Sequence, residues 1–225
     1  MDFAKPCIDV GLFTNRREDM LDFWQQEIGL PYDHLGKLGG GVQQHRHHMN
    51  GSIFKLNQAR DPLPDDPPSG YRELFIAKEG LIEAQNLTDP DGNKVTVVPP
   101  GTDGITGIGI KLGVRDPDAF HKFYRQILEL TPDGEGAYRV GSSKISFVYD
   151  RAAIRVGGWR APGYRYITIQ IFKADQEHAA ILERGGEQGQ KPRTIGTTAR
   201  YSFVRDPDGN WIEISQRAQL TGSLE

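Results

Sequence analysis

A five-residue turn sequence, Asp-Pro-Asp-Gly-Asn, occurs twice in this chain, at 89–93 and at 206–210. Each copy is followed by a run with the residue types of a β-strand, at 94–98 and at 211–214. Asp, Gly and Asn supply the backbone conformations of a tight turn. A turn that recurs together with its downstream strand indicates a duplicated building unit, so equivalent positions in the copies are where functional residues should be sought.

A strand followed by an amphipathic helix also recurs along the chain. The first pair is a strand at 8–14 with a helix at 16–28, and the second is a strand at 108–114 with a helix at 116–128. The apolar stripes of the two helices are Met20, Leu21, Trp24 and Ile28 in the first and Phe120, Phe123, Tyr124 and Ile127 in the second.

Two hairpins complete the repeat. The turn Asn50-Gly51 joins strands around 44–49 and 52–57, and its counterpart joins 138–141 to 144–149. The implied unit is strand–helix–strand–strand–strand. We predict an α+β protein of tandem βαβββ modules that form two domains with cup-shaped mixed sheets, of which the first is reduced.

The boundary between the two domains is predicted at the Pro- and Gly-rich segment 99–104, which divides the chain into 1–100 and 101–225. A third correspondence, 69–76 with 162–169, shows that the second half carries a longer insertion before its turn. That insertion includes a helical stretch at 175–183, so one module of the first half lacks its helix. Four prolines make 60–68 a stiff loop.

Composition narrows the class of protein. A net charge of −3 offers no electrostatic case for binding nucleic acid or an anionic membrane, and no apolar run is long enough to span a bilayer. One cysteine, Cys7, leaves no intramolecular disulfide and fits a reducing cytosol. We expect a cytoplasmic protein whose partner is a small molecule.

The strand-to-helix openings at 9–24 and 109–124, together with both Asp-Pro-Asp-Gly-Asn turns, resemble the vicinal oxygen chelate superfamily of glyoxalases, bleomycin resistance proteins and extradiol dioxygenases. The resemblance implies that paired modules curl into a cup that holds a divalent metal, here Fe, Mn, Mg or Zn. It also makes a homodimer one expected assembly. Ligands are expected on the first and last strands of each module. Strand alternation places Asp9, Gly11 and Phe13 in the cup.

The first half offers oxygen and nitrogen donors suited to such a metal. Asp9 and Glu73 fall at expected ligand positions, and His47 belongs to a cluster of three histidines within 45–48. We predict Asp9, His47 and Glu73 as metal ligands and His45 or His48 as general acid or base. The competing interpretations are that Asp9 and Glu73 form ordinary ion pairs and that the histidines line an exposed strand edge.

The second half has lost ligands at the corresponding positions, which are Gly109 and Tyr166, and keeps only Glu213. The leading hypothesis is therefore a metal-dependent lyase, isomerase or ring-cleaving dioxygenase that uses the first cup. The alternative is a metal-free small-molecule-binding or resistance protein of the same fold, whose ligand contacts are Lys111, Trp159, Tyr166 and Glu213.

Overall fold

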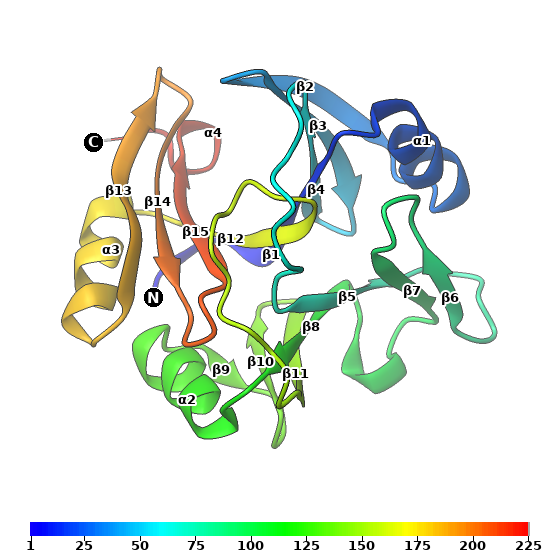
Figure 1. The fold of residues 1–225 in the computed structure, drawn as a ribbon. Coiled ribbons are helices and arrows are strands. Elements are labelled where there is room, and N and C mark those ends of the chain that lie inside the picture. The colour runs from blue at the N-terminus through cyan, green and yellow to red at the C-terminus, as the bar shows by residue number, and fades with distance from the viewer. Residues whose placement is uncertain (225) are drawn as a thin grey trace.

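The computed structural model describes residues 1–224, which form two mixed β-sheets and the helices that pack on them (Figure 1). Sheet A has the strand order β13-β14-β15-β12-β1-β4-β3-β2, and sheet B has the order β6-β7-β5-β8-β11-β10-β9. The strands of sheet A are β1 (Phe3–Thr14), β2 (Tyr32–Gly39), β3 (Val42–Met49), β4 (Ser52–Ala59), β12 (Gly163–Ile171), β13 (Glu187–Ile195), β14 (Ala199–Arg205) and β15 (Trp211–Arg217). The strands of sheet B are β5 (Tyr71–Ala77), β6 (Gln85–Thr88), β7 (Lys94–Val98), β8 (Ile108–Val114), β9 (Thr131–Pro132), β10 (Ala137–Val140) and β11 (Ser143–Tyr149). The helices are α1 (Arg17–Asp22), α2 (Pro117–Lys122), α3 (Ala174–Glu183) and α4 (Ala218–Thr221), with π-helical turns Phe23–Glu27 and Phe123–Ile127 that continue α1 and α2 and a short 3₁₀ turn Thr102–Gly104.

The predicted modules are confirmed. Strand–helix–strand–strand–strand order is found at 3–59, 108–149 and 163–217, and the module at 71–98 consists of β5, β6 and β7 without a helix. In chain order we call them module 1 (3–59), module 2 (71–98), module 3 (108–149) and module 4 (163–217). The start of α2 shows the local logic: Asp116 accepts a hydrogen bond from the backbone N–H of Ala119 at 3.0 Å, and Pro117 occupies the first helical position.

The modules pair differently from the division expected from the sequence. Sheet A combines module 1 with module 4, because β1 lies antiparallel to β12 with Asp9 opposite Thr168. Sheet B combines modules 2 and 3 through β5 and β8. Each sheet therefore draws on both 1–100 and 101–225. The expected linker at 99–104 joins β7 and β8 of one sheet, while 60–70 and 150–162 cross between the sheets.

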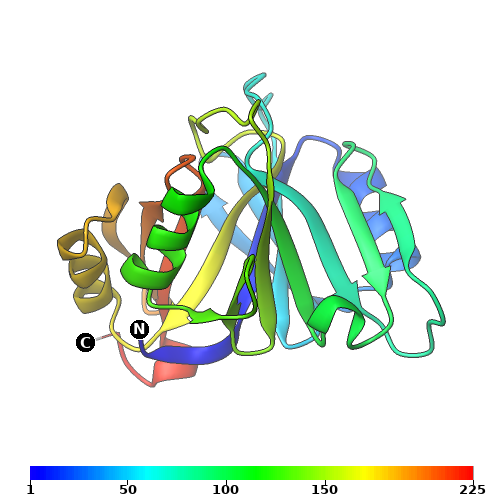
Figure 2. The same ribbon diagram turned by 90° about the horizontal axis from the view of Figure 1, so that it is seen from below.

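The main apolar core lies between the two sheets. Alternation along β1 sends Val10 and Leu12 into this core, together with Ile110 of β8 and Ile167 of β12, and leaves Asp9 and Phe13 on the opposite face. Figure 2 shows α2 and α3 toward one end of the molecule and α1 toward the other. The faces turned away from this core carry the polar side chains, and we call them cup A on sheet A and cup B on sheet B.

The repeated turns lie where the sequence predicts them, between β6 and β7 and between β14 and β15. In the second copy, Gly209 has φ +80°, a conformation that favours glycine, and the buried Asp206 carboxylate accepts from the backbone and side chain of Asn210 at 2.8 Å each. The side-chain oxygen of Asn210 in turn accepts from the backbone N–H of Gly70 at 2.7 Å. This turn thereby ties module 4 to the start of module 2.

Candidate functional site

Cup A is centred on a buried lysine. The ammonium of Lys55, on β4, donates to the hydroxyl of Thr168 on β12 at 2.6 Å and to the carboxylate of Glu213 on β15 at 2.7 Å. The Thr168 hydroxyl donates to the same carboxylate at 2.5 Å. The side chain of Lys55 is 3% exposed and that of Glu213 is 14% exposed. Together with Asp9 on β1, these residues place one polar side chain from each of the four central strands in the cup.

The charges of this group are coupled. Burial lowers the pKa of Lys55 below its usual value, although the carboxylates of Glu213 and Asp9 act in the opposite direction. Burial acts to raise the pKa of Asp9, but the ammonium groups of Lys55 and Lys5 outweigh it, so this pKa lies below its usual value. The Asp9 carboxylate is 2.6 Å from the ammonium of Lys5 and accepts from Gln170 at 3.0 Å. Asp9 therefore forms an ion pair with Lys5, as the interpretation that competed with metal binding expects.

A cavity of about 260 Å³ opens beside Lys55. Among the described residues that line it, Glu213 is the single acid, and the cations are Lys37, Arg46, Lys55, Arg160, Arg193 and Arg217. Arg46 is buried to 5% exposure; it donates to the side-chain oxygen of Gln44 at 2.8 Å, while its Nε has no hydrogen-bond acceptor. A buried guanidinium with spare donors is a ready site for an anion.

Aromatic rings form one wall of this cavity. The Trp159 ring lies 5.1 Å from Phe203 and 6.0 Å from Tyr166, measured between ring centroids. The hydroxyl of Tyr166 accepts from the side-chain amides of Gln44 and Asn57 at 3.3 Å each. Gly11 makes room for this ring, since a Cβ at that position would lie 2.2 Å from ring carbons of Tyr166. The wall offers a planar apolar surface beside the cations.

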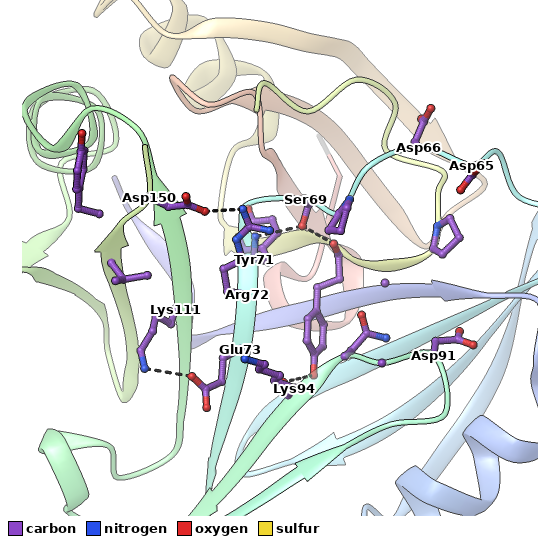
Figure 3. A pocket seen from close by; sticks show the side chains of 18 residues that line it. Asp65, Asp66, Ser69, Tyr71, Arg72, Glu73, Asp91, Lys94, Lys111 and Asp150 are labelled. Atoms are coloured by element: carbon purple, nitrogen blue, oxygen red, sulfur yellow. Dashed lines mark hydrogen bonds and ion pairs between the residues drawn. The ribbon is translucent and has the colours of Figure 1, made fainter. Parts of the chain in front are cut away.

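Cup B contains a larger and more open hollow of about 830 Å³ (Figure 3). Four of its charged side chains form two ion pairs: Lys111 is 3.1 Å from Glu73, and Arg72 is 2.9 Å from Asp150. The hollow is also lined by Asp65, Asp66, Asp91 and Lys94, so acids outnumber bases there. Lys111 is 36% exposed and Glu73 is 20% exposed, so both are better hydrated than their counterparts in cup A. Exposed, mutually satisfied pairs need no ligand. We therefore regard cup A, the smaller hollow, as the candidate site.

The three predicted metal ligands do not meet. Asp9 lies in cup A, Glu73 lies in cup B, and His47 lies on the face of β3 turned away from cup A, beside Gln25 and Phe54. Across residues 1–224 there is no group of three or more His, Cys, Asp or Glu side chains placed to hold a metal ion. The physical reason is the pairing of modules, which puts β1 and β5 in different sheets. The predicted three-residue metal site is therefore not formed.

Cup A also does not fit a divalent metal at the strand positions that the resemblance assigns to ligands. The β4 position is occupied by Lys55, which has no lone pair to donate while charged, and both nearby carboxylates already pair with ammonium groups. A dication there would lie against a buried cation without enough donors to compensate.

The predicted acid–base histidines are separated by the strand alternation of β3. His45 is buried behind the cup, and burial, followed by the charge of Arg17, lowers its pKa. His47 shares that face, and burial lowers its pKa to about 4. His48 points the other way, is 61% exposed and lies 3.9 Å from Asp33. None of the three lines the cavity beside Lys55.

Three of the four predicted substrate contacts, Trp159, Tyr166 and Glu213, do surround one cavity. The fourth, Lys111, lies in cup B, and the lysine that lines the cavity in cup A is Lys55. Sequence reasoning missed Lys55 and Arg46. The sequence nevertheless marks Lys55 as a candidate site residue. It is a charged residue between Phe54 and Leu56 in a predicted strand, and burying such a charge without a partner is costly, as it is for Asp9.

Comparisons with known proteins agree with this architecture. Residues 107–214 match the model of the Glyoxalase/Bleomycin resistance protein/Dioxygenase superfamily. Glyoxalase I from Zea mays has a similar fold: a glutamate-to-glutamine mutant superposes with TM-score 0.76 at 11% identity, covering 99% of this chain and 97% of that one, and another structure of the enzyme gives TM-score 0.70 at 14% identity, covering 92% and 91%. A putative dioxygenase from Bacillus subtilis gives TM-score 0.68 at 14% identity over 95% of this chain and 86% of that one. At these identities the likeness shows the fold alone.

A search of curated proteins found no significant match to this sequence. In the part of the chain that the structure describes, no helix is both long enough and apolar enough to cross a membrane.

Proposed function

We propose that this protein, whose residues 107–214 match the Glyoxalase/Bleomycin resistance protein/Dioxygenase superfamily, uses cup A to take up a small organic anion with a planar apolar part. We further propose that this binding requires no divalent metal. The observation that carries the proposal is the buried ammonium of Lys55, which fills the centre of the cup and neutralises the single lining carboxylate of the described cavity, Glu213.

The charge balance of the cavity supports an anionic ligand. With Glu213 paired to Lys55, the guanidinium of Arg46 is left with one hydrogen bond, to Gln44, and with Asp33 at 3.9 Å. Arg217 lines the same cavity, and burial followed by the charge of Arg46 lowers its pKa. Two partly desolvated guanidinium groups side by side repel each other, so a carboxylate or phosphate between them is stabilising.

The size and wall of the cavity support a ligand of about one ring. A volume of about 260 Å³ lies just below the range of drug-sized ligand pockets, which is about 300–1,000 Å³. The rings of Trp159, Phe203 and Tyr166 supply an apolar face for stacking. An acid group held by Arg46 and a ring against Trp159 together define the ligand class.

A titration of tryptophan fluorescence tests the proposal, because Trp159 lines the cavity. The probes are 4-methylbenzoate, its neutral analogue 4-methylbenzyl alcohol and its cationic analogue 4-methylbenzylamine, each measured with and without EDTA. We expect saturable binding of the anion alone, unchanged by the chelator. Replacing Arg46 by Met should weaken binding by roughly 10- to 100-fold, since hydrogen bonds to charged groups contribute about 1.5–3 kcal/mol.

The matched control is Arg72→Met in cup B, which removes an arginine that is 34% exposed and paired with Asp150. This variant should bind the anion as the unmodified protein does. Equal binding of anion and cation, or binding that disappears with EDTA and returns with a divalent metal, would contradict the proposal. Circular dichroism of each variant shows whether it is folded.

A further inference from the structure

We propose that Lys55 is a nucleophile that forms an imine with a small aromatic aldehyde or ketone carrying an acid group. This inference rests on the proposed function, because the anion site must first hold the ligand. It adds a covalent chemistry to cup A that needs no metal. Its basis is the position of the Lys55 amine, which lines the cavity while it contacts a carboxylate and a hydroxyl.

The surroundings of Lys55 provide what imine formation requires. Its nitrogen is 2.7 Å from Glu213, a distance at which the carboxylate can take and return a proton, and 2.6 Å from the Thr168 hydroxyl. A side chain that is 3% exposed has few competing water molecules. The lowered pKa of Lys55 acts in the same direction, since it increases the fraction of neutral amine.

Cup B provides a contrast within the same chain. Lys111 also pairs with a glutamate, at 3.1 Å from Glu73, but it is 36% exposed and lies over the ring of Phe75 at 4.5 Å. In Figure 3 the two side chains border the wide hollow. Lys111 therefore serves as the matched lysine that should not react preferentially.

Imine formation at Lys55 consists of an addition to the carbonyl followed by the loss of water. Lys55 passes a proton to Glu213, and the neutral amine attacks the carbonyl carbon, so that a C–N bond forms and the carbonyl π electrons move to oxygen. The attacking nitrogen, which is now positively charged, gives one of its protons to that oxygen, and a neutral carbinolamine results. Glu213 then returns its proton to the hydroxyl, water leaves, and the nitrogen lone pair forms the C=N bond of a protonated imine. One carbonyl and one ammonium become one iminium and one water, with no oxidant or reductant consumed.

Reductive trapping tests the inference. The full-length protein is incubated with 4-formylbenzoate and sodium cyanoborohydride, and the alkylated lysine is located by peptide mass mapping. We expect the peptide that contains Lys55 to be modified first and close to one adduct per chain. Lys55→Arg should lower the adduct to the background of exposed lysines, Lys111→Arg should leave it unchanged, and Glu213→Gln should slow its formation roughly 100-fold.

Binding of 4-methylbenzoate, which has no carbonyl to react, separates the two proposals. If that anion binds but the mapped adduct at Lys55 is no more abundant than at exposed lysines, the imine is refuted and the proposed function stands. If neither binding nor a preferred adduct is seen, both fail. The mapping is done on the unmodified protein, so the result does not depend on whether the Lys55→Arg variant folds.

Discussion

Removing the Lys55 ammonium while leaving Glu213 in place is expected to destabilise the fold. In Lys55→Met, the Glu213 carboxylate, 14% exposed, keeps only the Thr168 hydroxyl as a donor among its recorded partners. Breaking a buried ion pair by deleting one partner costs about 3–5 kcal/mol. Because Glu213 retains some contact with solvent, we expect about 3 kcal/mol, the lower end of that range.

The double variant Lys55→Met/Glu213→Met tests whether this cost comes from the uncompensated charge. Replacing both members of a buried pair by apolar residues is often close to neutral. We therefore expect the double variant to be more stable than Lys55→Met alone, with a coupling free energy of about 1–3 kcal/mol between the positions.

Urea unfolding at pH 7.5, followed by far-ultraviolet circular dichroism, measures these values for the unmodified protein, both single variants and the double variant. An unchanged m-value shows that the variants differ in the free energy of unfolding and not in the surface area that unfolding exposes. If the costs of the single variants simply add, or if Lys55→Met costs less than about 1 kcal/mol, the two groups are not a desolvated pair and the reasoning about cup A fails.

Three further perturbations follow from the structure. Burial lowers the pKa of His47 to about 4, below its value in the unfolded chain, so protonation of His47 opposes folding. The stability that neutral His47 contributes is present above about pH 6.5 and is lost as pH falls toward 4. His47→Gln should reduce this loss of stability, measured by urea titrations at several pH values. Asp206 changes stability with pH in the opposite direction, because burial raises the pKa of its carboxyl group to about 6. The stability that protonated Asp206 contributes is present below about pH 4 and is lost as pH rises through 6. Asp206→Asn should remove this loss in the same assay. Gly11→Ala places a methyl group 2.2 Å from the Tyr166 ring, so it should cost about 1–3 kcal/mol in thermal unfolding and weaken binding of 4-methylbenzoate, whereas an unchanged midpoint would show that the ring has room to move.

The modules and their turns were predictable because their signals are local. Alternation along β1 placed Asp9 on the face opposite Val10, and helical spacing placed Met20 and Trp24 in the core. The Asn50-Gly51 turn follows from the positive φ angles, 50° and 82°, that these two residue types tolerate. The grouping of Trp159, Tyr166 and Glu213 around one cavity was expected from the resemblance to the superfamily, under the metal-free alternative, and not from local patterns.

Only the tertiary structure decided which modules share a sheet. Lys55 meets Thr168 and Glu213 across 113 and 158 positions of the sequence, and no local pattern specifies that module 1 pairs with module 4. Each module exposes similar strand edges and a similar apolar face, so the choice depends on the packing of the whole core between the sheets. The same choice separated Asp9 from Glu73, which the resemblance to the superfamily had suggested as ligands of one metal, and placed Lys55 beside Glu213 in cup A.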